Sequence, residues 1–358
     1  MAEMTQINVH NLLNIQVDEH FCAEPNWARH WADLQQMSPV SDAAGPVTLR
    51  LEHQSSLDRT GMRQLTEHVY CRPGAMLDTR YRVLVSRPEP NVLMLQSESF
   101  CFEWKEWAVQ LGLLMGGATF IHCAAVERDG RAVIFPSWGG IGKTALVATL
   151  IREDGWRLLG DDFVIVTAES SCLGFPKPLV LYPYHRSMFP EAFAAGQGPR
   201  LPGGLNELAT GVAARVKPVL RLAPSLLSFA RNHNPQSRRV SASDVFGREN
   251  LAEQATPDKV IWLDRVAGIG APELLAPDER LASRIMGSSI SQWDPWCVAQ
   301  VNTAMGAGIF EAEALYCGWV ETIQRLLRSC TAGILHLPAD LPIEDVPQAA
   351  RMAINRLS

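Results

Sequence analysis

The sequence predicts an α/β protein in two parts, a strand-rich first part and a second part in which strands and helices alternate. Residues 47–53 and 79–86 alternate apolar and polar side chains, as half-buried strands do. Between residues 120 and 167, an apolar strand, a glycine loop, an apolar helix and another apolar strand follow one another. The chain has 358 residues, and a single core usually stops growing near ~250–300 residues, so we expect two domains, 1–105 and 106–358.

The composition excludes several classes of protein. Hydrophobic residues make up 47% of the chain, which excludes global disorder. Lys and Arg number 32 against 38 for Asp and Glu, a net charge of -6, so we expect no nucleic-acid partner. The eight cysteines form no Cys-x-x-Cys pair, and several lie in apolar stretches, which favours a reducing compartment. No basic region precedes an apolar run at the N-terminus, so we expect no signal peptide and a cytoplasmic location.

Two further segments of the first part predict structure. Residues 91–97 and 99–104 are expected to form another pair of strands. The segment NWARHWADL, residues 26–34, places two Trp and one Leu at helical spacing. This pattern favours a short helix docked on the core, with a partner-binding surface as the alternative.

An apolar stretch at residues 107–126 has about the length of a membrane span, ~20 residues. It contains polar residues, and the pair Gly116-Gly117 divides it. We therefore expect a helix over 103–115 and a strand over 120–126, both in a folded core, and no contact with a membrane.

The second part continues with elements that have clear boundaries. A turn at Asp129-Gly130 is expected to join two strands, and Gly155 to end a helix. The remaining expected elements are strands at 131–135, 259–264 and 332–338, helices at 277–286, 309–329 and 342–357, and long loops at 196–258.

Residues 137–144 read SWGGIGKT and match the phosphate-binding pattern G-x-x-x-x-G-K-[ST], except that Ser137 replaces the first glycine. Three glycines are expected to supply the positive φ that turns backbone N–H groups toward a phosphate. Lys143 is expected to reach the β- and γ-phosphates, and the Thr144 hydroxyl to hold Mg²⁺. The predicted nucleotide-binding residues are Ser137, Gly139, Gly140, Ile141, Gly142, Lys143 and Thr144. The alternative is a chance glycine turn that caps a helix.

A pair of adjacent carboxylates, Asp161 and Asp162, follows Lys143 by 18 residues on an apolar strand. Adjacent strand residues point to opposite faces, so the two carboxylates are expected to have different roles. One would hold Mg²⁺ while the other accepts a proton from an attacking hydroxyl. A solvated turn and a single metal-binding aspartate, as in an ATPase, are the alternatives.

These residues resemble the core of HPr kinase/phosphorylase. The likeness is carried by His122 before a hairpin, Gly130 in its turn, the run GGIGKT, an apolar helix, and GWRLLGDD at 155–162. It covers roughly residues 107–167 and extends to the HPr kinase-related proteins of bacterial biosynthetic gene clusters. The resemblance implies a P-loop fold shared with phosphoenolpyruvate carboxykinases, with a mixed sheet and flanking helices, and a homo-oligomer.

The resemblance also implies an activity, the transfer of phosphate from ATP to a hydroxyl, usually a serine of a protein or peptide. It implies that Asp161 is the general base, that Asp162 supports the metal or the base, and that His122 lies beside the site. For His122 the alternative is an ordinary core histidine. The family's Glu-containing glycine signature is not clear here, where LNELATG with Glu207 only poorly echoes it, so HPr itself is not the expected acceptor.

We therefore expect an Mg²⁺- and ATP-dependent kinase acting on a protein, a peptide or a small hydroxyl-bearing compound. The alternative is a nucleotide-binding switch or ATPase scaffold, in which Asp264, at the end of the apolar run VIWLD, holds the metal. A third hypothesis is a kinase whose turnover Ser137 and Trp138 have blocked. Candidates for a cation at the transferred phosphate are Lys177, Arg186, Arg238, Arg239 and Arg265.

Overall fold

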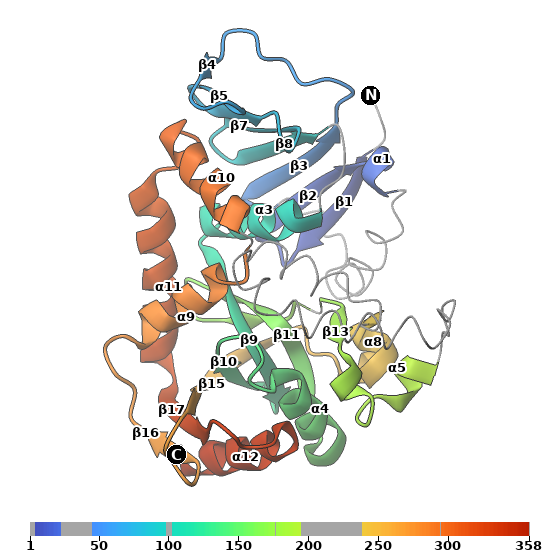
Figure 1. Ribbon diagram of the computed structural model, residues 1–358, viewed down its shortest axis with the longest axis vertical. Helices are drawn as coiled ribbons and strands as arrows, with labels where there is room; N and C mark the ends of the chain where they lie inside the picture. The colour runs from blue at the N-terminus through green and yellow to red at the C-terminus, as the bar shows by residue number, and fades with distance from the viewer. Residues whose placement is uncertain are drawn as a thin grey trace, which may run out of the picture.

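The structure, a computed structural model, describes residues 4–22, 45–97, 102–175, 177–194, 238–293 and 295–357. It is a mixed α/β protein with mixed sheets, flanking helices and a strand-rich N-terminal region, as predicted. Figure 1 shows the N-terminal sheet at one end of the molecule and a second large sheet at the other, with helix α3 between them. The helix expected at 26–34 and the segment with Glu207 lie outside the described residues.

The N-terminal sheet has eight strands in the order β1-β2-β3-β8-β7-β6-β5-β4. The pairs β2–β3 and β3–β8 are parallel and the others antiparallel. The strands are β1 (Met4–Val9), β2 (Leu13–Asp18), β3 (Val47–His53), β4 (Arg63–Gln64), β5 (Val69–Arg72), β6 (Ala75–Asp78), β7 (Val83–Glu89) and β8 (Val92–Ser97). The strand expected at 79–86 starts later, because a turn with a positive φ of 53° at Arg82 precedes β7. The strand expected at 99–104 is wrong over 102–104, since helix α3 begins at Phe102, and the first three residues of this expected strand lie outside the described part of the chain.

Helices from distant parts of the chain cover the N-terminal sheet. Helix α3 (Phe102–Met115) and helix α10 (Pro295–Gly306) contribute to the same hydrophobic core as β1, β2 and β3. The buried carboxylate of Asp78 accepts a hydrogen bond from Gln300 of α10, which ties this helix to β6. Helix α10 was not predicted, because its covering role depends on contacts with residues some 200 positions earlier in the chain.

The second sheet has seven strands in the order β10-β9-β11-β12-β15-β17-β16, with an additional pairing of β10 and β15. Strands β10, β15 and β17 run parallel, so their carboxyl ends meet at one edge. The strands are β9 (Ala118–Arg128), β10 (Arg131–Pro136), β11 (Arg157–Thr167), β12 (Cys172–Leu173), β15 (Gln254–Val266), β16 (Glu273–Leu275) and β17 (Thr331–Pro338). The predicted turn between β9 and β10 is confirmed, with positive φ at Asp129 and Gly130.

The predicted division of the apolar stretch 107–126 is also confirmed. Helix α3 ends at Met115, Gly117 has a φ of 76°, and β9 starts at Ala118. None of the helices in the described part of the chain is both long and apolar enough to span a bilayer.

Helices pack on both faces of the second sheet (Figure 1). Helix α4 (Lys143–Asp154) and helix α12 (Val346–Arg356) share one core with it, and helix α9 (Leu281–Ile290) and helix α11 (Gly318–Ser329) share another. The helix expected at 309–329 is shorter, since a π-helical turn, η3 (Glu313–Cys317), precedes α11. The remaining elements are α1 (Glu19–Cys22), β13 (Leu179–Leu181), η1 (Pro183–His185), α5 (Pro190–Ala194), β14 (Arg238–Val240), α8 (Ala242–Phe246), η2 (Arg248–Asn250) and η4 (Ile343–Asp345).

Candidate functional site

The glycine loop joins the carboxyl end of β10 to the start of α4. Gly140 and Gly142 have positive φ, 81° and 107°, and Gly142 immediately precedes the helix. Gly139 does not have positive φ, so the expectation that all three glycines supply it is wrong for this residue. Gly142 has no side chain with which to cap α4, so this residue leaves the first N–H groups of the helix uncapped at the loop. Such a helix start attracts anions.

Lys143 is buried beneath the loop. Its Nζ atom donates to Ser137 Oγ at 3.0 Å and to the Trp138 carbonyl oxygen at 3.2 Å. Burial lowers the pKa of Lys143, while the nearby carboxylates of Asp162 and Asp161 oppose this shift. The hydroxyl of Ser137 therefore has a role that glycine at this position would lack, because it holds the ammonium group in place.

The other two loop side chains point in different directions. Ile141 is buried in the core shared by α4 and α12 and anchors the loop from below. Trp138 is 43% exposed and makes an edge contact with Trp262 at 6.1 Å between ring centroids. Trp138 therefore presents an aromatic surface beside the lysine.

The two aspartates lie in an irregular part of β11. The pairing of β11 with β9 shifts register between Leu158 and Gly160, and Asp162 has a φ of 86°. Positive φ is unusual for a residue other than glycine and costs of order 1–3 kcal/mol, so surrounding contacts must hold it. A β-carbon on Gly160 would lie 2.1 Å from the Phe163 carbonyl oxygen, so only glycine fits this bend.

The neighbouring carboxylates have different partners, as predicted. Thr144 Oγ1 donates to Asp161 Oδ2 at 2.8 Å. Asp162 instead lies between His122 and Lys177, with His122 Nε2 at 3.2 Å from Oδ1 and Lys177 Nζ at 2.7 Å from Oδ2. Thr144 thus contacts Asp161. The sequence had instead led us to expect Thr144 and Asp162 as the two ligands of Mg²⁺.

The surroundings push the pKa values of the two aspartates apart. Burial raises the pKa of Asp161 to about 6, and the charge of Asp162 adds to the rise. Burial acts on Asp162 as well, but Lys177 and His122 outweigh it and hold the pKa of Asp162 well below its ordinary value. Two titratable groups driven apart in this way are typical of acid–base sites.

His122 is buried on β9, and burial lowers its pKa although the hydrogen bond to Asp162 opposes the shift. A carboxylate accepts only, so the neutral ring carries its proton on Nε2. Its Nδ1 atom is buried and has no hydrogen-bond partner among the described residues. A satisfied core histidine would have both nitrogens paired, so the predicted place of His122 beside the site suits this geometry better.

The raised pKa of Asp161 predicts a pH-dependent stability difference. Between pH 4 and 6 the folded state binds the Asp161 proton more tightly than the unfolded state, so raising the pH through this window destabilises the protein. Asp161→Asn removes this loss of stability, because asparagine does not titrate, and it keeps an oxygen that accepts the hydrogen bond from Thr144. Relative to the wild type, this variant should gain on the order of 2–3 kcal/mol of unfolding free energy between pH 4 and pH 7.5.

Urea unfolding of both proteins across this pH range measures the difference. Parallel pH dependences of the two unfolding free energies would contradict the burial-raised pKa of Asp161. Asp154→Asn, at a partly exposed carboxylate paired with Arg351, serves as the control for the loss of a carboxylate elsewhere in the fold.

The structure also places the remaining candidate residues. Arg265 donates to the carbonyl oxygens of Pro338, Ala339 and Leu341, so it ties the end of β15 to the chain after β17. Arg186 stacks over the Phe193 ring. Arg238 and Arg239 lie on β14, which pairs with β13. Of the five candidate cations, the described contacts bring only Lys177 to the aspartate pair.

Asp264 lies beside the glycine loop, because Ser137 forms an isolated parallel bridge with Leu263. Its carboxylate is partly exposed and makes no hydrogen bond or ion pair within the described part of the chain. Asp264 therefore lies next to the loop, but no hydrogen bond or ion pair within the described part of the chain joins it to the aspartate pair.

The described residues fit a magnesium ion whose coordination is completed by oxygens of the substrate. No cluster of three or more His, Cys, Asp or Glu side chains suited to a metal occurs among them. Mg²⁺ is, however, usually held by one or two protein oxygens together with substrate phosphates and waters. The adjacent oxygens of Thr144 and Asp161 at the start of α4 supply that donor set.

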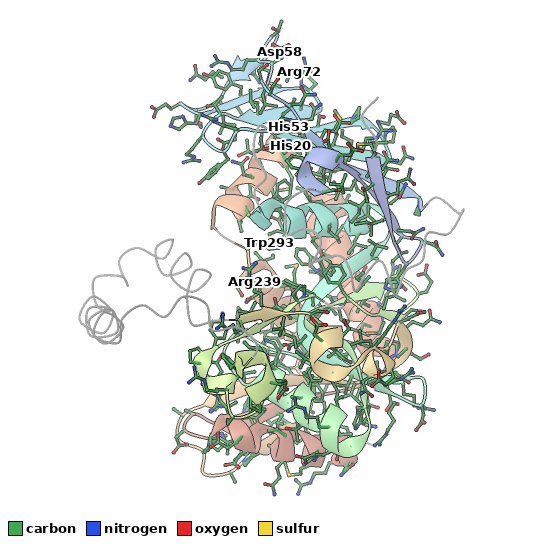
Figure 2. All side chains as sticks on the ribbon, turned by 90° about the vertical axis from the view of Figure 1, so that its right-hand side faces the viewer. His20, His53, Asp58, Arg72, Arg239 and Trp293 are labelled. Atoms are coloured by element: carbon green, nitrogen blue, oxygen red, sulfur yellow. The ribbon has the colours of Figure 1, made fainter. Side chains whose placement is uncertain are left out.

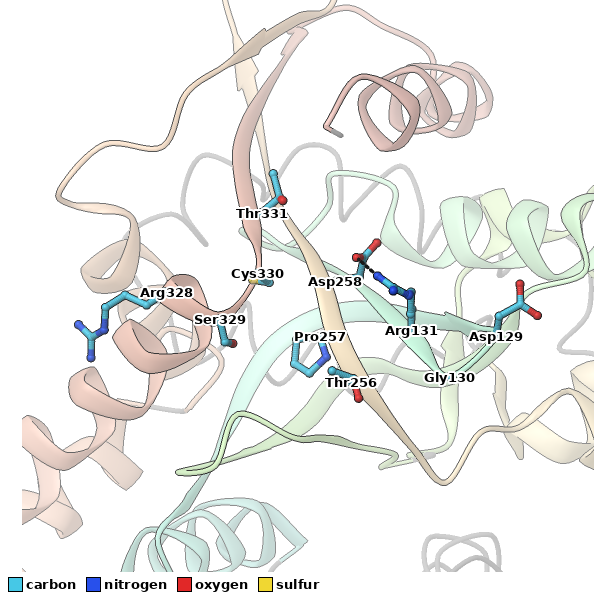
Figure 3. A pocket seen from close by; sticks show the side chains of 10 residues that line it. All are labelled: Asp129, Gly130, Arg131, Thr256, Pro257, Asp258, Arg328, Ser329, Cys330 and Thr331. Carbon is cyan, nitrogen blue, oxygen red and sulfur yellow. Dashed lines mark hydrogen bonds and ion pairs between the residues drawn. The ribbon is translucent and has the colours of Figure 1, made fainter.

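A groove of about 610 Å³ lies at the other end of the parallel strands (Figure 3). Arg131 at the start of β10, Asp258 of β15 and Thr331 at the start of β17 contribute to its lining. The Arg131 guanidinium pairs with Asp258 at 3.0 Å, so acidic and basic groups offset each other there. The groove contains none of the predicted site residues.

Comparison with known proteins gives no family for this chain. No protein-family model matches it, and no curated protein is significantly similar to it. The resemblance to HPr kinase therefore depends on the quoted residues alone.

Proposed function

We propose that this protein is an Mg²⁺- and ATP-dependent kinase with a P-loop kinase fold, which transfers the γ-phosphate to a hydroxyl of a protein, a peptide or a small compound. The observation that carries the proposal is the junction of the glycine loop with the aspartate pair, in which Thr144 at the helix start is hydrogen-bonded to Asp161. A glycine turn that caps a helix by chance needs neither a buried lysine under the loop nor two carboxylates beside it.

The contacts support a division of labour between the aspartates. Asp161, bonded to Thr144, belongs on the metal side, where Mg²⁺ would neutralise charge on the phosphates when bound. Asp162 is more open, with 39% of its side chain exposed, so an acceptor hydroxyl can reach it, and His122 and Lys177 fix its orientation. This assignment interchanges the roles expected from the sequence.

Phosphoryl transfer depends mainly on positioning and on charge neutralisation, because its transition state is loose. A base with a low pKa is therefore sufficient to orient the acceptor hydroxyl. Lys143 would offset charge on the terminal phosphates, and the start of α4 would supply N–H donors to them.

One observation favours a second function, a nucleotide-dependent switch or ATPase that transfers phosphate only to water. The carboxylate of Asp264 lies beside the loop without a hydrogen bond or ion pair to any described residue, and such proteins use a carboxylate of this kind as a metal ligand. In that case Asp264 rather than Asp161 would hold Mg²⁺, and no general base for an acceptor hydroxyl would be needed.

Single substitutions distinguish these functions. We expect Asp162→Asn to bind Mg·ATP within a few-fold of wild type and to lose transfer to serine-containing peptides by ~10²–10⁴-fold, the usual contribution of a general base. Asp161→Asn should raise the Mg²⁺ concentration needed for half-maximal rate, and Asp264→Asn should change neither property. Labelled ATP with a peptide library and intact-mass detection gives the readout. Loss of turnover in Asp264→Asn with full turnover in Asp162→Asn would instead favour the switch.

A further inference from the structure

Lys177 fixes the geometry of Asp162. Its Nζ atom lies 2.7 Å from Asp162 Oδ2 and 4.9 Å from the centre of the Phe163 ring, and only 13% of its side chain is exposed. Asp162 has the unusual positive φ of 86°, which must be held by its surroundings. Within the described part of the chain, the ion pair with Lys177 and the contact with His122 hold the carboxylate of Asp162 in place.

The segment that carries Lys177 is attached to the second sheet by its backbone. The N–H of Gly174 donates to the Glu253 carbonyl oxygen at 2.7 Å. The N–H of Phe175 donates to the Leu159 carbonyl oxygen at 2.9 Å. The Lys177 N–H donates to the Phe175 carbonyl oxygen at 2.8 Å. The Gly174 carbonyl oxygen accepts a hydrogen bond from outside this segment.

That bond comes from the N-terminal sheet. His10, in the turn between β1 and β2, lies with its Nε2 atom 2.8 Å from the Gly174 carbonyl oxygen. A carbonyl oxygen can only accept, so Nε2 is the donor. His10 is separated from Gly174 by 164 positions in the chain, and this contact joins the two large sheets next to the aspartate pair.

Hydrogen bonds between its own residues brace the turn that presents His10. His10 and Asn11 both have positive φ, 51° and 58°, and the N–H of Leu12 donates to the Val9 carbonyl oxygen. The buried Asn8 side chain closes the turn from inside, accepting from the Asn11 N–H and donating to the Asn11 side chain. A turn braced in this way holds the imidazole in one place.

We propose that the β1–β2 turn of the N-terminal sheet is part of the catalytic centre, with His10 acting as a positioning residue that holds Gly174, three positions before Lys177, and thereby the Lys177–Asp162 ion pair. This inference rests on the proposed function. It assigns to the N-terminal region a role in setting the geometry of the transfer step, so a ligand that moves this turn would change the rate at the site.

The test compares three substitutions in the full chain. His10→Leu removes the donor to Gly174, His10→Gln keeps a donor on a side chain of similar reach, and His20→Leu is the control. His20 is an exposed histidine of helix α1, stacked on His53 of β3 with 3.9 Å between the ring centroids, and Figure 2 shows both residues in the part of the molecule that holds the N-terminal sheet. The measured quantities are kcat and KM for Mg·ATP, with water or the best peptide as acceptor.

We expect His10→Leu to lower kcat ~10-fold and to leave KM for Mg·ATP within two-fold, since misplacement of a catalytic group by a distant change lowers the rate strongly. His10→Gln should restore kcat to within about three-fold of wild type, and His20→Leu should match the wild type. In a Lys177→Met background, His10→Leu should cause no further loss, because both changes act on the same contact. Equal kcat for His10→Leu and wild type, no rescue by His10→Gln, or fully additive losses would each overturn the positioning role.

Hydrogen exchange separates failure of this inference from failure of the proposed function. In His10→Leu the backbone amides of the segment 172–181 should exchange faster than in His20→Leu, and unchanged exchange would overturn the positioning role even in an active kinase. Absence of any ATP-dependent transfer by the wild type would overturn the proposed function, and with it the catalytic meaning of the contact.

Discussion

Replacement of Lys143 by methionine is expected to abolish Mg·ATP binding, with an affinity loss of at least ~100-fold. The Nζ atom lies at the base of the glycine loop, where Ser137 and Trp138 hold it, and methionine has a similar volume without the charge. The fold should survive, because the methionine side chain fills the same buried space. Calorimetric titration with Mg·ATP measures the loss, and denaturant unfolding checks the fold.

Lys259→Met is the matched control for this experiment. Lys259 is also a lysine of low exposure with a carboxylate partner, Asp258 at 3.0 Å, but it lies at the opposite end of the parallel strands. It should leave Mg·ATP affinity unchanged. If Lys143→Met bound Mg·ATP with wild-type affinity, the loop would not be a phosphate-binding loop, and the alternative of a glycine turn that only caps a helix would hold.

Replacement of Gly160 by alanine is expected to destabilise the protein by at least ~3 kcal/mol and to remove transfer activity. The new β-carbon would lie 2.1 Å from the Phe163 carbonyl oxygen, a distance that side-chain movement cannot relieve because the obstacle is backbone. The backbone of β11 must therefore change its path at residue 160. This change would separate Asp161 from Thr144 and Asp162 from His122 and Lys177. Urea unfolding and the peptide transfer assay measure the two effects.

Gly139→Ala provides the comparison within the same site. A β-carbon there meets no atom within 4 Å, and the residue does not have positive φ. Its unfolding free energy should stay within ~0.5 kcal/mol of wild type. Similar stability for the two variants would show that the bend at Gly160 is not rigid.

Local signals in the sequence predicted the elements that local chemistry determines. Gly117 and Gly155, both with positive φ, divide α3 from β9 and end α4 where expected. The turn at Asp129-Gly130 and the glycine loop follow the same rule, because the residue type itself permits the conformation. The mixed α/β architecture could be inferred from the order of such elements.

The partners within the site could not be predicted in this way. Which aspartate faces Thr144 depends on the register shift before Gly160, and a shift of one residue changes the face of every side chain that follows. The contact of His10 with Gly174 leaves no local pattern, because it depends on how two sheets meet. Lys177 was one of five candidate cations until the fold placed it against Asp162.

The shared core of the N-terminal sheet has a consequence for how the chain is made. Side chains of α10 and of residues 307–315 complete the core of strands whose own residues end at Ser97. A ribosome adding ~5–20 residues per second needs about 10–40 s to make the intervening ~200 residues. During that interval the finished strands expose the apolar face that α10 will cover, so this sheet completes its folding only after most of the chain has been synthesised. A fragment ending before α10 would keep that face exposed and would be prone to aggregate.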